Sequence, residues 1–314
     1  MGRYLVTGGC GFIGSNLVKN LLCDCHEVVV VDDLSTGFRE NIPSNVEIFE
    51  ANVNDVRILT KVFNKHIDGC FHLAANPSVS ASLNDYLGCH KTNLGGTIAV
   101  LEVAARLKAK INKIVPIVFA SSCAVYGNPG KKILSESEKF EPLSAYGVDK
   151  LCGELHAEYS ARILGVPSIG LRFFNIFGPG QSPQSDYSGV LSIFCKNMSQ
   201  GDQVTIFGDG CQTRDFVFVD DAVEALRKAM EITLEHSPGV FNICKGTGIS
   251  IFDIGKRIAE LCDLDFHPQY DLEREGDIKF SVGDPTLAQN LLTWHPSTEL
   301  NDGLLQTIEW MRGV

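Results

Sequence analysis

The first half of the chain alternates short apolar runs with helix-like segments. RYLVT (3–7), EVVVVD (27–32) and IVPIVFASS (114–122) are unbroken runs rich in apolar and β-branched residues, and FIGSNLVKNLL (12–22) and GTIAVLEVAARL (96–107) between them are helix-like. Unbroken apolar strands that alternate with helices are typical of a parallel sheet covered on both faces. The sequence therefore predicts an α/β fold with a Rossmann-type, doubly wound parallel sheet.

After Asn175 this alternation loosens into FGPGQSPQSDYSG, and the elements that follow are shorter. We expect residues 1–175 to form a dinucleotide-binding domain and residues 176–314 to form mainly a smaller substrate-binding α/β lobe. The segment of about 213–243, which reads as a strand and a helix, can return to the first domain. The crevice between two such lobes is the expected ligand site.

The composition excludes several classes of partner. A net charge of -11 argues against nucleic acid, since nucleic-acid-binding proteins usually carry a basic patch. The eleven cysteines are scattered and never spaced CxxC, so we expect no metal site and mostly reduced, buried thiols. No apolar run has membrane-spanning length, and MGRYLVTGG lacks the features of a signal peptide. These features together predict a cytoplasmic protein.

The segment TGGCGFIGSNLV, residues 7–18, follows the first strand and begins a helix. Gly8, Gly11 and Gly14 allow a tight turn, a close approach of the backbone to a pyrophosphate, and close packing of the helix. The next strand ends 24 residues after Gly8 in Asp32, whose carboxylate can bond ribose hydroxyls and repel a 2′-phosphate. The alternative is a strand-to-helix turn without a ligand. The order of these elements favours a dinucleotide site that prefers NAD to NADP.

In SAYGVDK, residues 144–150, Tyr146 lies four positions before Lys150. On a helix these positions share a face, so the ammonium can lie beside the phenol and favour its ionised form. Such a pair also arises by chance, so its context must decide whether it moves protons.

That context comes from IVFASSCAVYG, residues 117–127, which we expect to be a fourth strand ending at Ser121 and Ser122. Ligands bind outside the carboxyl ends of such strands, where the helix of Tyr146 should begin. Ser122, Tyr146 and Lys150 are therefore expected to converge. A serine at this place can instead cap a turn or a helix.

Six segments, in this order, resemble motifs of the extended short-chain dehydrogenase/reductase family, in its nucleotide-sugar epimerase and dehydratase branch. They are TGGCGFIG, HLAA, SSCAVYG, YGVDK, LRFFNIFGPGQ and GDGCQTRDFVFVDD. The resemblance spans nearly the whole chain. It implies that Tyr146 is the acid/base, that Lys150 lowers its pKa and binds the nicotinamide ribose, and that Ser122 bonds a substrate hydroxyl. A phenol with a pKa near 10 is a poor base at neutral pH until positive groups stabilise its anion.

The resemblance also implies binding residues. Those expected to contact NAD are Gly8, Gly11, Phe12, Ile13, Gly14, Asp32, Asp33, Asn52, Val53, Leu73, Ala74, Ala75, Asn93, Tyr146, Lys150 and Phe173. Those expected to contact a UDP-sugar are Ser78, Ser122, Cys123, Asn175, Gly189, Val190, Phe207, Arg214, Arg274, Asp277 and Ser281. Within the second set, Asn175, Arg214 and Arg274 correspond to groups that hold the diphosphate, which suits arginine forks. Asp277 corresponds to an acid near the nucleotide ribose, and Phe207 to the wall beside uracil.

The positions after Ser122 bear on the reaction. In related 4,6-dehydratases an Asp and a Glu follow the hydroxyl residue, and related decarboxylases keep a Glu in this stretch. Here Cys123 and Ala124 stand there, and neither can supply those proton transfers. The resemblance therefore implies 4-epimerisation of a UDP-hexose, in which C4 is oxidised, the 4-keto sugar turns, and the same hydride returns. The alternatives are a UDP-glucuronate 4-epimerase, a dehydratase, a reductase, or a non-catalytic dinucleotide sensor.

Two small residues bear on the substrate. The family has a bulky side chain at the position of Ser281 where only unsubstituted hexoses turn, and Gly189 corresponds to another wall. The resemblance thus implies a pocket for UDP-GlcNAc and UDP-GalNAc as well as UDP-Glc and UDP-Gal, unless these small residues carry no selectivity. Cys123 replaces the family's usual Ser or Thr, and Asn52 replaces an Asp. Relatives commonly form homodimers through a four-helix contact, here residues 96–107 and the helix of Tyr146, although that apolar stripe can also be internal core.

Overall fold

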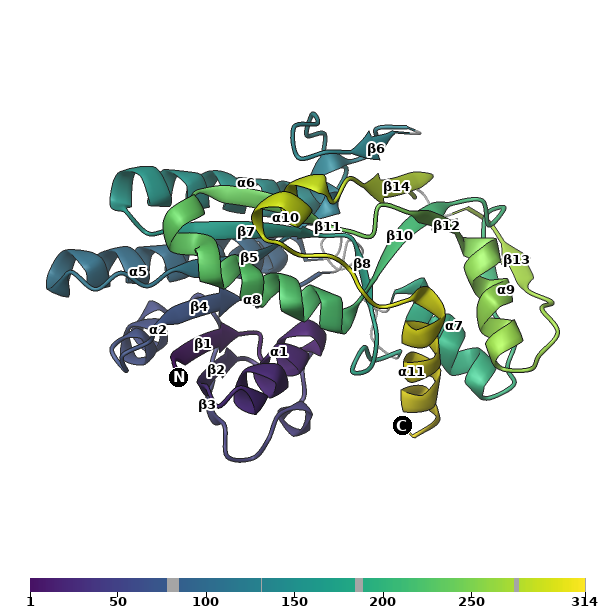
Figure 1. Cartoon of the computed structure of the whole chain (residues 1–314), viewed down its shortest axis with the longest axis horizontal. Coiled ribbons are helices and arrows are strands. Elements are labelled where there is room, and N and C mark those ends of the chain that lie inside the picture. Colours follow the sequence, from purple (N-terminus) through teal and green to yellow (C-terminus); the bar gives the residue numbers. More distant parts are fainter. Residues whose placement is uncertain (78–84, 131, 184–188, 274–276, 314) are drawn as a thin grey trace.

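The computed structural model describes residues 1–77, 85–130, 132–183, 189–273 and 277–313. Within these ranges seven strands form one sheet in the order β11-β7-β5-β4-β1-β2-β3, and all neighbours are parallel (Figure 1). The strands are β1 (Arg3–Thr7), β2 (Glu27–Asp32), β3 (Glu47–Glu50), β4 (Gly69–His72), β5 (Ile117–Ser122), β7 (Ser168–Phe173) and β11 (Gly239–Ile243). The predicted parallel sheet is confirmed.

Helices cover both faces of this sheet (Figure 1). On one face lie α1 (Phe12–Cys23) and α8 (Val219–His236), and on the other lie α2 (Val56–Phe63), α5 (Gly96–Ile111) and α6 (Ala145–Tyr159). The run of valines in β2 shows why its sequence is unbroken. Val30 packs in the core beneath α1 and α8, whereas Val29 packs in the core beneath α2 and α5, and both are almost fully buried. Successive strand residues point to opposite faces, so two covered faces require continuous apolar sequence.

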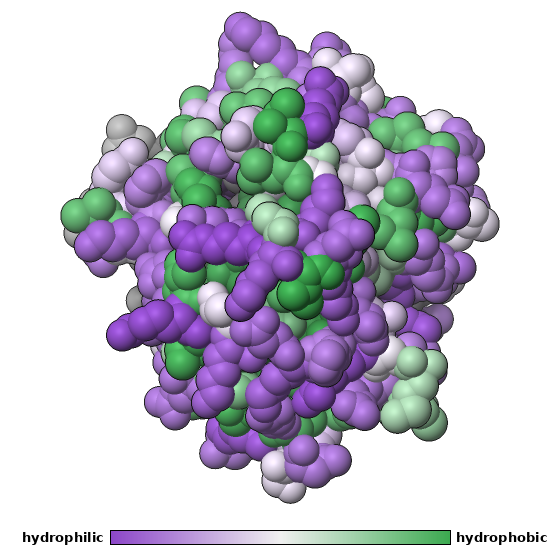
Figure 2. Space-filling model, turned by 90° about the vertical axis from the view of Figure 1, so that its left-hand side faces the viewer, coloured by the Kyte–Doolittle hydropathy of each residue, from purple (hydrophilic) through white to green (hydrophobic). Residues whose placement is uncertain are grey.

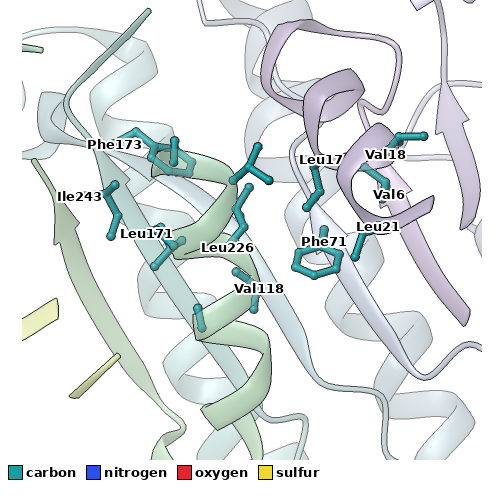
Figure 3. Close-up of a cluster of buried hydrophobic side chains, with 14 of the residues drawn as sticks. Val6, Leu17, Val18, Leu21, Phe71, Val118, Leu171, Phe173, Leu226 and Ile243 are labelled. Atoms are coloured by element: carbon teal, nitrogen blue, oxygen red, sulfur yellow. The ribbon is translucent and has the colours of Figure 1, made fainter. Parts of the chain in front are cut away.

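Figure 3 shows the core on the α1 and α8 side, where Leu17, Leu21 and Leu226 meet Phe71 and Val118 of the sheet. This packing fixes the helices against the strands. The large sheet reverses its direction of winding between β1 and β4, which are neighbours. In open α/β sheets, ligands bind outside the carboxyl ends of the strands at such a reversal.

A second, smaller sheet with its own helices lies beyond the carboxyl ends of the large sheet (Figure 1). This sheet has the order β12-β10-β14-β6, with β8 also paired to β10, and all its pairs are parallel except β10 with β12. These strands are β6 (Ile133–Leu134), β8 (Asn175–Phe177), β10 (Thr213–Phe218), β12 (Gly248–Ser250) and β14 (Phe280–Gly283). The predicted smaller α/β lobe is present, and a ribbon of β9 (Thr205–Phe207) and β13 (Gln269–Asp271) adjoins it.

Three helices, α7 (Val190–Ser199), α9 (Ile251–Leu261) and α11 (Leu300–Arg312), pack around a separate apolar core in this region. The described residues also form two short helices, α4 (Tyr86–His90) and α10 (Thr286–Leu291). The chain crosses between the two sheets more than once, because β6 joins the small sheet and β11 joins the large one. The division into domains at residue 175 stays a prediction.

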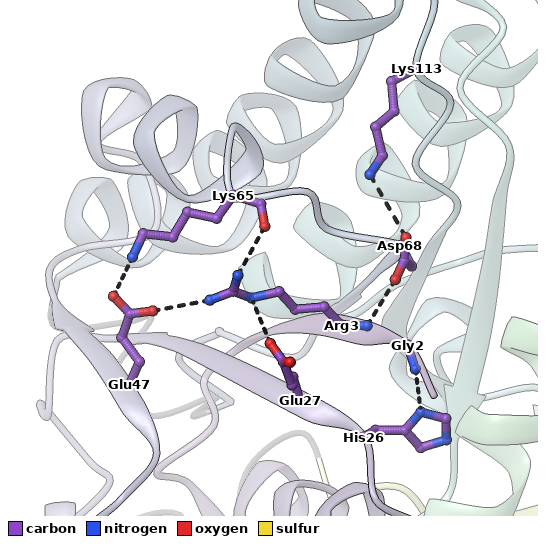
Figure 4. A network of polar contacts seen from close by, with 8 residues as sticks. All are labelled: Gly2, Arg3, His26, Glu27, Glu47, Lys65, Asp68 and Lys113. Atoms are coloured by element: carbon purple, nitrogen blue, oxygen red, sulfur yellow. Dashed lines mark hydrogen bonds and ion pairs between the residues drawn. The ribbon is translucent and has the colours of Figure 1, made fainter.

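Polar residues gather at the opposite, amino-terminal edge of the large sheet (Figure 4). Arg3 of β1 pairs with Glu27 at 3.5 Å and with Glu47 at 3.4 Å, and its backbone N–H donates to Asp68. These partially exposed ion pairs contribute little to stability. They join the beginnings of β1, β2 and β3 far from the carboxyl edge.

Some sequence expectations need correction. The strand that ends in Ser122 is the fifth along the chain, because β3 was missed. All eleven cysteines are free, but five are buried and three, Cys23, Cys25 and Cys211, are exposed, so the prediction that most are buried is wrong. In the described ranges no helix has the length and apolarity to cross a membrane. Figure 2 shows a face on which hydrophobic side chains are interspersed with hydrophilic ones.

Candidate active site

A cavity of about 740 Å³ lies at the carboxyl edge of the large sheet. Such a volume is within the usual range for cofactor and substrate sites. The cavity is lined by the predicted NAD residues Gly8, Gly11, Phe12, Ile13, Gly14, Asp32, Asp33, Asn52, Val53, Leu73, Ala74, Ala75, Tyr146, Lys150 and Phe173, and by Ser122. The structure therefore brings residues between positions 8 and 173 of the chain into one place.

The first turn is shaped by two of its glycines. Gly8 has a φ of +70°, and a side chain there would meet the backbone of Ala74 at 2.7 Å. A Cβ on Gly14 would lie 2.1 Å from the carbonyl oxygen of Gly8. Both positions therefore require glycine, and together they let α1 begin directly against β1 and β4.

The N-terminus of α1 is open to the cavity. Its N-cap is Gly11, no described side chain caps it, and its first turn carries no acid. Free backbone N–H groups and the helix dipole suit an anionic pyrophosphate, so this turn fits NAD.

Asp32 ends β2 at the wall of the cavity. Its two oxygens accept hydrogen bonds from the backbone N–H groups of Cys10 at 2.8 Å and Leu34 at 2.9 Å. The carboxylate thus holds the first turn as well as facing the place predicted for ribose. Burial raises the pKa of Asp32, and these two hydrogen bonds oppose that rise. Beside it, Asn52 donates to Asp33 at 2.9 Å, so the amide that replaces the family's usual acid is tied to a neighbouring carboxylate.

The predicted catalytic residues also converge. Ser122 ends β5, where its hydroxyl oxygen accepts from the backbone N–H of Ala124 at 3.2 Å and lies close enough to Tyr146 to lower the pKa of that phenol. Tyr146 and Lys150 lie one turn apart on α6, which begins after the N-cap Ser144. Lys150 Nζ lies 5.6 Å from the centre of the Tyr146 ring and donates to the carbonyl oxygen of Ala120 at 2.7 Å.

The pKa values of Tyr146 and Lys150 are shifted in opposite directions. Burial raises the pKa of Tyr146 to about 12, although the nearby Ser122 hydroxyl lowers it in part. Burial lowers the pKa of Lys150 to about 8, against the opposing effect of Asp149 and Glu154. The phenol of the chain alone is therefore protonated at neutral pH. Its ionisation by Lys150 together with the positive nicotinamide, as the resemblance implies, stays a prediction.

Asn93, one of the residues predicted to contact NAD, is not among the described lining of the cavity but contacts a residue that is. Asn93 is 2% exposed, and its side chain accepts from Asn76 N at 2.7 Å and donates to Asn76 O at 3.1 Å. Asn76 and the neighbouring Pro77 line the cavity. Asn93 thus shapes the loop that follows HLAA.

The predicted substrate residues form two groups beyond this cavity. Cys123 and Ser281 lie together, with the Ser281 hydroxyl 3.9 Å from the Cys123 sulfur. Arg214 and Asp277 form an ion pair of 2.6 Å. Gln212, which sequence reasoning missed, donates to Asp277 at 3.2 Å and to the carbonyl oxygen of Phe207 at 2.7 Å. Its place in GDGCQTRD, two residues before Arg214, was the only sequence signal for it.

The remaining substrate predictions are less direct. Asn175 donates its amide to the carbonyl oxygen of Asp215 at 2.9 Å. Gly189 is the N-cap of α7, which Val190 begins, and a Cβ on Gly189 would meet the Gln181 amide at 3.6 Å. Neither Gly189 nor Val190 is among the described lining of the large cavity. Ser78 and Arg274 lie outside the described residues.

Sequence reasoning missed other residues of the cavity wall. They include Ser35, Thr36, Phe38, Asn41, Asp85, Lys91, Thr92, Gly180 and Gln181. Most of them come from the turn after β2 and from the segment around α4. Neither segment carries an apolar pattern or a motif, so only the fold places them there.

Taken together, the doubly wound sheet, the glycine turn with its acid, and the Ser–Tyr–Lys set in one cavity define a Rossmann-type dinucleotide enzyme. The chain belongs to the NAD dependent epimerase/dehydratase family, whose model matches residues 4–244. It is therefore an NAD-dependent enzyme of the epimerase/dehydratase class, and NAD is its cofactor.

The chain is similar to proteins of known name over almost its whole length. It is 35% identical to a putative UDP-glucose 4-epimerase of Methanocaldococcus jannaschii, covering 98% of both chains. A solved UDP-glucose 4-epimerase of Thermotoga maritima with UDP-glucose has a TM-score of 0.93 and 37% identity, covering 99% of each. A UDP-N-acetylglucosamine 4-epimerase of Methanobrevibacter ruminantium in complex with UDP-N-acetylmuramic acid has a TM-score of 0.92 and 32% identity, covering 99% of this chain and 98% of that one.

Proposed function

We propose that this protein is a UDP-hexose 4-epimerase that interconverts UDP-GlcNAc with UDP-GalNAc and UDP-Glc with UDP-Gal. The observation that carries the proposal is the convergence of Ser122, Tyr146 and Lys150 at the carboxyl edge of the sheet, with no carboxylate at the next two positions. The names of the similar proteins support the same reaction.

In this proposal the protein removes one proton from the C4 oxygen of the sugar and later returns it. Tyr146 Oη takes that proton as C4 is oxidised and gives it back as C4 is reduced from the other face. Ser122 holds the C4 oxygen beside the phenol, and the Lys150 ammonium favours the phenolate. Bound NAD would supply the hydride chemistry at C4 and the further positive charge of its oxidised ring. Cys123 and Ala124 leave this part of the site without a group that could remove water from the sugar.

The substrate range follows from small residues around the proposed sugar pocket. Ser281 is 6% exposed and faces Cys123, so the two side chains present only a hydroxyl and a thiol. Both are compact, which suits an N-acetyl group at this wall. We propose that Arg214, now paired with Asp277, holds the diphosphate and that Phe207 lies near the uracil.

The test is an assay without added reductant. The purified protein is incubated separately with UDP-Glc, UDP-GlcNAc and UDP-GlcA, and the products are resolved by chromatography. We expect 4-epimers of the first two and retention of deuterium placed at C4. Conversion of UDP-GlcA alone, release of a dehydrated sugar, or loss of the deuterium to solvent would each contradict the proposal.

We also propose that the protein is a homodimer through α6. Four apolar side chains, which we call the α6 stripe, follow one face of this helix and its continuation, and they are 41, 59, 53 and 68% exposed. They are Val148, Leu155, Tyr159 and Ile163. Such spacing is that of a single helix face. The apolar side chains of α5 in the expected four-helix contact, such as Val100, Leu101 and Val103, are buried in the core of the protein. The α6 stripe is exposed, so in this proposal it is the part of the contact that pairing of two copies covers.

A further inference from the structure

Helix α6 meets the end of β5 at three consecutive strand residues, Ala120, Ser121 and Ser122. Tyr146 lies near the hydroxyl of Ser122, which lowers the pKa of the phenol. Lys150 donates to the carbonyl oxygen of Ala120, and Glu154 accepts from the hydroxyl of Ser121 at 2.5 Å. The helix residues are four apart, so all three lie on the same face. The first two contacts belong to the proton-transfer site, whereas Glu154 has no part in the mechanism above.

Glu154 is held firmly from the other side as well. Arg172 of β7 donates to its two oxygens through Nε at 2.8 Å and Nη2 at 2.7 Å. Arg172 also donates through Nη1 to the hydroxyl of Tyr126 at 2.8 Å. Glu154 and Arg172 are only 7% and 3% exposed. A planar guanidinium fork paired with a carboxylate fixes both groups in direction as well as distance.

The strands explain why this ion pair reaches the active site. Ser121 and Arg172 are direct neighbours across the β5–β7 ladder, so Glu154 bridges two adjacent strands from the helix above them. Ser121 itself lines the cavity, as do Ser122 and Phe173, the residues that follow Ser121 and Arg172. A buried ion pair seldom adds stability over apolar packing, so its better-attested use is to specify one arrangement.

We propose that Glu154 is a positioning residue, which through Ser121 fixes α6 on the end of β5 and so sets where Tyr146 and Lys150 stand relative to Ser122. This rests on the proposed role of Tyr146 in proton transfer. The register matters because proton transfer requires the acid/base within hydrogen-bond reach of the reacting oxygen. A shift of about 1 Å in such a group can cost on the order of a hundredfold in rate.

The test removes the hydrogen bond between Ser121 and Glu154 and leaves the ion pair of Glu154 with Arg172 in place. Ser121→Ala removes the hydroxyl but leaves Glu154 bonded to Arg172, whereas Glu154→Gln leaves Arg172 without its full partner and can fail to fold. Ser121→Cys keeps nearly the same volume with a weaker donor, so it gives an intermediate case. The matched control is Ser168→Ala. Ser168 is also buried and donates to α6, at the carbonyl oxygen of Ala157 3.2 Å away, but it lies outside the active site.

We expect Ser121→Ala to lower kcat roughly tenfold with KM for the UDP-sugar changed by less than about twofold, because the lost contact acts on the proton-transfer geometry. Ser121→Cys should lie between this variant and the unchanged protein. Ser168→Ala should retain kcat. An unchanged kcat in Ser121→Ala, or an equal loss in Ser168→Ala, would overturn the proposal.

Two further measurements test the positioning role of Glu154 independently of the proposed epimerase activity. Hydrogen exchange of the amides of residues 145–150 should quicken in Ser121→Ala and not in Ser168→Ala, whether or not any sugar is epimerised. Unchanged exchange there refutes the positioning role even if the protein proves to act on another sugar. Binding of NADH to the cofactor-free protein, followed by fluorescence, should be alike in both variants. A weakening that matches the loss of kcat would assign Ser121 to the cofactor instead.

Discussion

Lys150 lies one helical turn from Tyr146, with its ammonium 5.6 Å from the centre of the phenol ring, yet the pKa of Tyr146 is raised to about 12. The dominant cause is burial of the phenol against the cavity wall. The Lys150 ammonium donates a hydrogen bond to the carbonyl oxygen of Ala120, and this bond holds the lysine side chain against β5. The Tyr146 phenol of the chain alone is thus a proton donor. Its ionisation at neutral pH needs further positive charge, which bound oxidised NAD would supply.

Replacement of Tyr146 by phenylalanine should abolish most turnover. Tyr146→Phe keeps the ring and removes the hydroxyl that carries the proton, so kcat should fall by about 10² to 10⁴. The cofactor should remain bound, because the turn at Gly8 and Asp32 is untouched. Tyr4→Phe is the control, since Tyr4 packs on Phe71 and His26 away from the cavity. Full turnover in Tyr146→Phe would favour a dinucleotide sensor or another acid/base.

The pH dependence should report on Lys150. Its pKa is lowered to about 8, so the ammonium is present below that pH and is lost above it. We therefore expect kcat/KM to fall above about pH 8, well before the phenol of Tyr146 ionises in the free protein. The titratable groups near this ammonium include Asp149 and Glu154 on the same helix and the buried His72 on β4, besides the phenol of Tyr146.

The check on this assignment is Lys150→Arg, whose guanidinium stays charged throughout the accessible range. Its rate should be lower, because the fork does not reproduce the ammonium geometry, but its alkaline decline should disappear. If the decline persists unchanged in Lys150→Arg, another group causes it. The measurement is kcat/KM from about pH 6 to about pH 10 in both proteins.

Sequence patterns predicted the large sheet well where strands are buried on both faces. β2 is the clear case, because Val29 and Val30 must both be apolar. The same rule explains the omission of β3, Glu47–Glu50, which lies at the edge of the sheet and carries glutamate at both ends. The segment of about 213–243 was predicted to be able to return to the first domain, and β11 within it does join the large sheet. Its partner β7 was not predicted, because this pairing joins residues about 70 positions apart and no local pattern encodes it.

In the candidate site, too, residues within one short motif were predicted, whereas contacts between segments far apart in the sequence were not. Gly8, Gly14 and Asp32 were found because their roles follow from a short, ordered stretch of sequence. The link of Glu154 to Ser121 and Arg172 joins three elements and leaves no motif, and Gln212 is significant only through its contact with Asp277. Such side-chain pairings depend on strand register and helix rotation, which the pattern of apolar residues does not fix.

Substrate range should respond to bulk at Ser281. Ser281→Tyr fills the space beside Cys123 and should lower kcat/KM for UDP-GlcNAc at least about tenfold more than for UDP-Glc, because only the N-acetyl group needs that volume. Ser281→Thr adds one methyl group and is the matched control. Thermal unfolding of both variants shows whether the strand still packs. Equal losses on the two sugars in a stably folded Ser281→Tyr would remove Ser281 from the substrate wall.

The oligomeric state should depend on the α6 stripe. Leu155 is 59% exposed at the middle of the stripe, so Leu155→Glu would place a charge in the proposed contact between copies. We expect sedimentation to show a dimer for the unchanged protein and a monomer for this variant. Leu234→Glu, on α8 with a 63% exposed side chain, is the control and should remain dimeric. A monomer in the unchanged protein at micromolar concentration would contradict the proposal directly.

Asp215 should govern how the stability of the junction between the two sheets varies with pH. Its carboxylate is fully buried and accepts backbone N–H groups of Lys245 at 2.7 Å, Gly246 at 2.9 Å and Gly283 at 3.3 Å. Burial nevertheless raises its pKa to about 6. A pKa raised in the folded state means that the folded protein binds more protons between about pH 4 and about pH 6. This contribution to the free energy of unfolding is therefore present at the acid end and falls as the pH rises through that window.

Asp215→Asn removes this titration and replaces one acceptor with an amide donor facing those N–H groups. We expect the variant to lose about 1–3 kcal/mol at neutral pH, because buried donors are left without partners. The deficit should be larger near pH 4.5 than near pH 7.5, since only the unchanged protein gains stability on acidification through about pH 6. Urea unfolding at both pH values, with the exposed Asp265→Asn as control, measures it. A deficit that shrinks towards acid pH would show that the Asp215 carboxyl has an ordinary or lowered pKa.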